Sequence, residues 1–185
     1  SLLSSAAYTI YTSTGLTGTN LKPWTLIFSS SSGLSPYTTD WGVDFAALLE
    51  TATNYVSVRA WDVAGSSATV ADAFFVLKDT TLPTVTDNQP GETFWRNVNT
   101  GSYNVDFGDT AGGSLLSHFQ TKVFAGPLQT GATVEDWTTV ASGLNVSTYT
   151  ADWGLLAGTW GSLPSAINYV SARAVDNAGN TAQTV

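Results

Sequence analysis

The chain resembles itself at a nearly constant offset of about 113 residues, and this similarity constrains its fold more than any other feature. Ser1–Ser4 recurs as Ser114–Ser117 without a gap. The longest match pairs Asn54–Gly65 with Asn168–Gly179, with nine identities in twelve positions. A fixed period indicates a repeated structural unit. Because this period is much longer than the roughly 20 to 50 residues of solenoid repeats, we expect each unit to be a whole domain.

The junction between the two copies lies near residue 81. A β-rich run ends at Leu77, and Pro83, which has no backbone N–H to donate, begins the next unit. We therefore assign residues 1–80 to the first copy and residues 81–185 to the second. Both copies are incomplete, because the first has no counterpart of residues 82–113 and the second has none of Phe74–Leu77. We expect a piece cut from a longer array; the alternative is that neighbouring chains lend the missing strands.

Short apolar runs between turn residues predict an all-β chain. The runs are rich in Thr, Val, Tyr, Phe and Ile, and none keeps helical spacing for more than about two turns. Val56, Val58 and Ala60 alternate with polar residues, as expected for a strand with one buried face. The predicted strands of the second copy are 84–86, 103–107, 119–125, 137–141, 148–151 and 169–174, and the first copy adds 73–77.

Composition argues against several classes of partner and chemistry. The formal net charge of -8 disfavours binding to nucleic acid or to anionic lipid. The chain has no cysteine, which excludes disulfides, thiol nucleophiles and zinc–thiolate sites within it. No apolar run reaches the ~20 residues of a membrane-spanning helix, so we expect no membrane insertion.

No group of residues in the sequence is typical of a catalytic site, and we predict that the chain is not an enzyme. His118 is the only histidine and aligns with Ser5, so a histidine mechanism would operate in one copy only. No Gly-x-Ser-x-Gly motif is present to activate a serine. Asp62 and Asp176 recur beside glycines at strand ends, where we expect them to accept hydrogen bonds from their own turns.

A calcium site is one hypothesis for ligand binding, because calcium prefers oxygen ligands. The candidate ligands are carboxylates near the ends of the domains, namely Asp62, Asp79 and Asp176. No D-x-D-x-D loop accompanies them.

A glycan site is a second hypothesis, because aromatic side chains can stack on sugar rings. Four tryptophans recur between the copies and are expected to occupy packing positions: Trp24, Trp41, Trp137 and Trp153. Three others have no tryptophan counterpart and are the candidate ligand platforms: Trp61, Trp95 and Trp160.

The recurring segments 55–65 and 169–179 resemble the penultimate strand and turn of fibronectin type III and bacterial Ig-like repeats. The linker 79–83 is similar to junctions between such repeats in very long bacterial surface and secreted proteins. The resemblance implies tandem Ig-like β-sandwiches that form a spacer, stalk or adhesin-like array outside a bacterial cell, with neighbouring repeats as partners. Two alternatives stay open: a sandwich module that binds a glycan or a surface protein, and a subunit of an extracellular filament, a homopolymer assembled by strand exchange.

Overall fold

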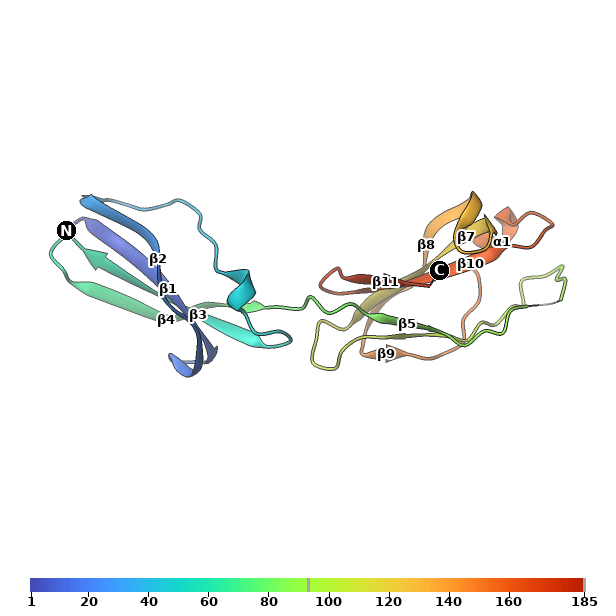
Figure 1. Cartoon of the computed structure of the whole chain (residues 1–185), viewed down its shortest axis with the longest axis horizontal. Helices are drawn as coiled ribbons and strands as arrows, with labels where there is room; N and C mark the ends of the chain where they lie inside the picture. The colour runs from blue at the N-terminus through green and yellow to red at the C-terminus, as the bar shows by residue number, and fades with distance from the viewer. Residues whose placement is uncertain (93, 185) are drawn as a thin grey trace. The chain divides into compact units, whose positions relative to one another are not determined.

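The computed structural model describes residues 1–92 and 94–184, and antiparallel β-strands make up most of it (Figure 1). The helical elements are short, a 3-10 helix at Phe45–Ala47 and α1 at Ala157–Ser162. The prediction of an all-β chain is confirmed. The chain divides into two compact units between Asp79 and Thr80, close to the junction assigned from the sequence.

The first unit contains one four-stranded antiparallel sheet. The strand order is β2-β1-β3-β4, so β1 and β3 lie at the centre. The segment predicted as a strand at 73–77 is the second half of a longer strand, β4. The strands are β1 (Leu3–Ser13), β2 (Thr17–Leu34), β3 (Thr53–Asp62) and β4 (Ser67–Leu77).

The second unit contains a four-stranded sheet with the corresponding order, β8-β7-β10-β11. The pairing of the central strands also corresponds, because Ile10 lies opposite Val56 in the first unit and Val123 lies opposite Val170 in the second. The outer hairpins share their register shifts as well. The strands are β7 (Leu116–Gly126), β8 (Thr130–Val146), β10 (Tyr169–Asp176) and β11 (Thr181–Gln183).

A second, smaller sheet is found only in the second unit among the residues described. Its order is β5-β6-β9, and the strands are β5 (Thr84–Asp87), β6 (Val105–Gly108) and β9 (Thr148–Tyr149). The range predicted at 103–107 therefore starts too early, with Tyr103 forming only an isolated bridge to Trp153, and the range predicted at 148–151 is too long.

The core of the second unit lies between its two sheets. Phe107 of β6 stacks on Phe119 of β7 with ring centroids 4.3 Å apart, and both are at most 2% exposed. Trp153 is also buried, and its Nε1 donates a hydrogen bond to the Val105 carbonyl at 3.1 Å. The small side chains of Ala172 and Ala174 on β10 complete this core.

The core of the first unit lies between its sheet and the loop that follows β2. Tyr8 and Ile10 of β1 are buried with Val56 of β3, and the loop contributes Trp41 and Leu48. Trp41 stacks on Tyr8 with ring centroids 5.4 Å apart. One layer of this core is therefore a sheet and the other is a loop.

Candidate functional site

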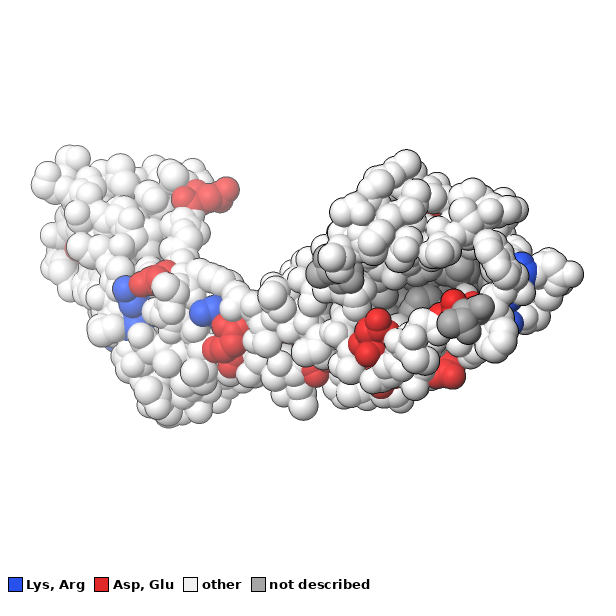
Figure 2. Space-filling view, turned by 45° about the vertical axis from the view of Figure 1, so that its right-hand side comes forward, with Lys and Arg blue, Asp and Glu red and all other residues white. Residues whose placement is uncertain are grey.

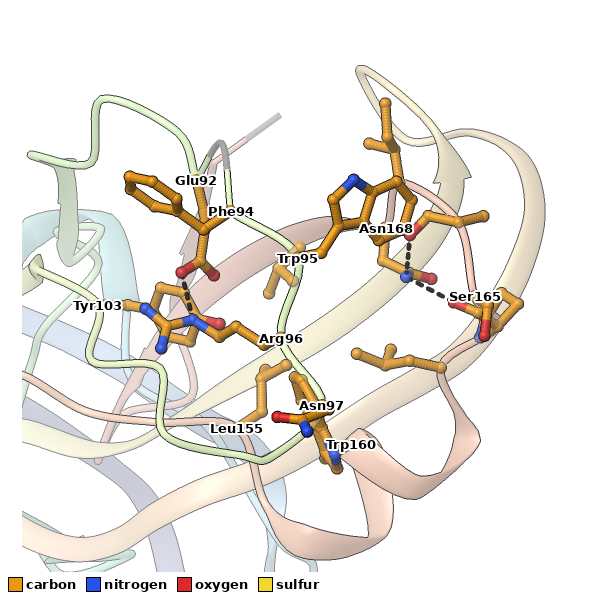
Figure 3. A pocket seen from close by; sticks show the side chains of 15 residues that line it. Glu92, Phe94, Trp95, Arg96, Asn97, Tyr103, Leu155, Trp160, Ser165 and Asn168 are labelled. Carbon is orange, nitrogen blue, oxygen red and sulfur yellow. Dashed lines mark hydrogen bonds and ion pairs between the residues drawn. The ribbon is translucent and has the colours of Figure 1, made fainter.

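The second unit contains a cavity of about 710 Å³, which we call the aromatic cavity (Figure 3). Its walls come from the loop between β5 and β6, from α1 and from the segment that leads into β10. Phe94 and Trp95 of the loop are 79% and 81% exposed, so their rings are open to contact with a ligand. The other aromatic residues in the lining are Tyr103 and Trp160.

Trp160 is positioned by the attachment of α1 to β8. The Glu135 carboxylate accepts hydrogen bonds from the hydroxyls of Ser162 at 2.7 Å and Thr159 at 3.1 Å. These bonds, with that of Ser162 first, hold the pKa of Glu135 below its ordinary value. Charge-assisted hydrogen bonds of this kind fix geometry as well as adding stability, so α1 presents Trp160 to the cavity from an anchored position.

Polar groups lie beside the aromatic rings of the cavity. Glu92 and Arg96 form an ion pair within the loop. Burial raises the pKa of Tyr103, and the negative charge of Glu92 raises it further. Asn168 donates hydrogen bonds from Nδ2 to the carbonyls of Pro164 and Ala166 (Figure 3). The cavity therefore combines apolar ring faces with a few polar groups, a composition typical of small-ligand sites.

The three candidate platforms do not form one site. Trp95 and Trp160 line the same cavity although 65 positions separate them in the sequence, whereas Trp61 lies in the first unit on β3. There Arg59 lies 5.8 Å from the Trp61 ring centroid. Sequence reasoning missed Phe94 and Tyr103 as cavity residues, because neither their spacing nor their neighbours indicate that they approach α1.

The tryptophans that recur between the copies occupy packing positions, as predicted. Trp41 and Trp153 contribute to the two cores. Trp24 on β2 and Trp137 on β8 each lie under an arginine from the next strand but one, Arg59 on β3 and Arg173 on β10. The guanidinium carbons lie 4.4 Å and 4.3 Å from the respective ring centroids.

A second cavity of about 420 Å³ lies beside the first, along the edge of β10, and we call it the edge cavity. Its lining includes core residues, among them Val105 and Ala172. The two cavities share lining residues at the start of β10, including Asn168 and Val170. The concave surface of the second unit therefore follows one edge of a strand rather than forming an isolated pocket.

The recurring aspartates act in turns, as predicted. Asp62 Oδ1 accepts from the Ser66 amide and Asp176 Oδ1 accepts from the Asn180 amide, both at 2.8 Å. Hydrogen bonds, first from the Ser1 hydroxyl, hold the pKa of Asp62 below its ordinary value. The turn glycines that follow, Gly65 and Gly179, have φ values of 86° and 92°, a conformation that favours glycine.

Two of the calcium candidates belong to the first unit and one belongs to the second. Asp62 is occupied in its turn, Asp79 is the last residue of the first unit, and Asp176 belongs to the second unit. A carboxylate oxygen of Asp176 lies within 4.8 Å of one from Asp109, which sequence reasoning did not consider. Calcium binding stays a prediction.

His118 lies on β7, with Nδ1 3.2 Å from the Ser117 hydroxyl oxygen. Figure 2 shows charged side chains in small, separate groups on a largely uncharged face. Among the described residues, none of the helices is long and apolar enough to cross a membrane.

No protein-family model matches this chain, and no curated protein matches it in sequence.

Proposed function

We propose that this chain is a non-enzymatic structural region built of repeated β-units, a spacer or stalk within a large bacterial surface or secreted protein. The observation that carries the proposal is the occurrence of the same four-stranded sheet in both units, with corresponding strand order and register. Domains repeated in series set a reach that grows with their number, so such a region functions through its length.

The features that the two units share support this proposal, because they are features of the framework. They are an arginine over a tryptophan, a buried or partly buried asparagine at the start of a central strand, and an aspartate that closes a turn. By contrast, Trp95, Trp160 and His118 occur in the second unit only. A role common to both units therefore rests on the sheet and its turns.

The surface composition also suits a spacer. Only 11% of residues are charged, and acidic residues outnumber basic ones, 14 to 6. A net negative charge keeps long arrays soluble and repels neighbouring copies, and a low density of charge gives few strong electrostatic contacts to partners.

The test is to lengthen the array by one period and measure its size. A variant that carries residues 1–113 again ahead of Ser1 keeps the internal period continuous. Small-angle scattering should show the maximum dimension rising by a fixed increment with each added period. A control with a Gly/Ser insert of equal length should instead grow roughly with the square root of its length. A maximum dimension that stays constant as periods are added would contradict the spacer role.

A further inference from the structure

The edge of β10 that faces β11 is paired along only part of its length. β11 pairs with Arg173–Val175, and the Thr184 amide donates to the Ala172 carbonyl at 2.8 Å. In the part of the chain that the structure describes, no strand pairs with Tyr169–Val170 on this side. An open strand edge presents unpaired backbone groups and is a ready template for another strand.

The first unit shows what occupies the same position there. Its last strand, β4, continues along β3, with Phe74 opposite Val56 and Val76 opposite Asn54. Val56 is fully buried as a result, whereas its counterpart Val170 is 40% exposed. The side chain at this position is therefore apolar in both units but covered in only one of them.

The asparagine at the start of the strand gives independent support. Asn54 is fully buried, its Oδ1 accepts from the Leu49 amide, and its Nδ2 donates to carbonyls that include that of Val76 on β4. Among the residues that the structure describes, its counterpart Asn168 has no bond to a strand, and its buried Oδ1 has no hydrogen-bond partner. Buried polar atoms are nearly always paired in folded proteins, so this edge lacks a neighbour that the first unit has.

We propose that the groove along Ile167–Val170 accepts one more β-strand that continues directly from β11 and places bulky apolar side chains on its inner face, as Phe74 and Val76 do on β4. The register up to this point corresponds, because Arg173 lies opposite Gln183 as Arg59 lies opposite Thr69. In the first unit the register then shifts between Val58 and Val56, and the added strand requires the same shift. Residues that continue this line reach Val170 and then Asn168. This inference rests on the proposed repetition of the unit.

The edge cavity has the chemistry that this strand requires. In the first unit the side chains of Phe74 and Val76 point to the core side, where Phe74 lies 5.9 Å from Trp41 and Val76 packs on the core. In the second unit the corresponding side chains would enter the edge cavity beside Val105 and Ala172. The lining also includes polar residues, among them Asp87 and Gln129, but its apolar part at Val105 and Ala172 favours apolar side chains.

The experiment compares the chain with a variant that carries a second copy of Asp72–Lys78 after Val185. Amide exchange within residues 167–170 should slow by at least about tenfold, and the melting temperature of the second unit should rise by about 5 °C. The matched control carries Phe74→Asp and Val76→Asp in the appended copy only. It has the same length and should show neither change.

Three other outcomes would overturn the proposal. If the extended chain and its control exchange alike, the groove does not take this strand. If the original chain forms dimers or polymers in sedimentation and the same amides become protected, a second copy is the occupant. If soluble hexasaccharides quench tryptophan fluorescence saturably in the original and extended chains alike, the groove is a glycan site. None of these results changes the dimension that each added period contributes in a monomeric sample, so failure here is distinguishable from failure of the spacer role.

Discussion

The two units share one sheet but differ in what covers it. In the second unit the sheet β5-β6-β9 covers the inner face of β10, and Ala172 and Ala174 are at most 3% exposed. In the first unit a loop covers part of the corresponding face, and Val70 and Phe74 on β4 remain 60% and 40% exposed. Strand order and register nevertheless correspond. The residues of the sheet and its turns therefore specify the sheet, whereas the segment 82–113 determines how completely its face is buried.

The largest expected difference between the units concerns this second layer. Phe107→Ala removes a ring that is 2% exposed and stacked on Phe119, and it should destabilise the second unit by about 3 to 5 kcal/mol. The first unit should keep its stability, because its core contains no residue of β6. Chemical denaturation, monitored by amide exchange in each unit, measures the stability of both units. Phe75→Ala, at a position 60% exposed, is the control and should cost less than about 1 kcal/mol. Equal losses in both units would show that they do not fold separately.

The equivalent asparagines sharpen the comparison at the strand edge. Asn54→Ala should destabilise the first unit by about 2 to 3 kcal/mol, because it leaves the Leu49 amide and the Val76 carbonyl without a buried partner. Asn168→Ala should cost about 1 kcal/mol, since it removes only bonds to the loop before β10. Urea denaturation of the two variants gives the difference directly. A larger loss of stability for Asn168→Ala than for Asn54→Ala would mean that the edge of β10 beside Asn168 already has its hydrogen-bond partners.

The sequence predicted the features that depend on local pattern and failed where distant segments meet. Alternation located strands, and the repeated Asp62 and Asp176 predicted the turns, because both depend on neighbours a few residues apart. The aromatic cavity depends on the loop carrying Trp95 reaching the helix carrying Trp160, and no periodicity encodes that approach. The length of β8 was also missed, since its ends have polar residues and are held by pairing with β7.

A third comparison concerns the charged residue that attaches the segment between β2 and β3 in the first unit and the segment between β8 and β10 in the second. Lys22 and Glu135 hold equivalent positions, opposite Ile10 and Val123. Lys22 forms an ion pair with Asp44 of the covering loop at 2.6 Å, whereas Glu135 accepts hydroxyl hydrogen bonds from α1. Equivalent positions therefore hold these segments with side chains of opposite charge, a lysine for the loop in the first unit and a glutamate for α1 in the second.

Acidification should weaken both the Lys22–Asp44 ion pair and the hydrogen bonds of Glu135 to α1, whereas salt should weaken only the ion pair. The pKa of Asp44 is lowered by Lys22, and that of Glu135 by the Ser162 hydroxyl, so each contribution is present above the ordinary carboxyl range and is lost as the pH falls through the lowered pKa. Tryptophan fluorescence between pH 6 and pH 2 should report both losses. Glu135→Ala should cost about 1 kcal/mol. Raising the salt concentration at pH 6 should affect the anchor at Lys22 alone, because exposed ion pairs are screened. Equal salt sensitivity of the two anchors would contradict this distinction.

The smallest expected effect is also the one that should be equal in the two units. Arg59→Ala and Arg173→Ala each remove a guanidinium group from above a tryptophan ring, at 4.4 and 4.3 Å from the centroid. Each should lower stability by about 0.5 to 1 kcal/mol, as expected for partly exposed cation–π contacts. Replacement by lysine is the control and should recover part of each loss, since it restores the charge but not the planar group. Because these contacts lie on parts of the framework that both units share, the two losses should agree. Losses that differ by more than about 0.5 kcal/mol in thermal denaturation would show that what covers the inner face of each sheet also affects its outer side.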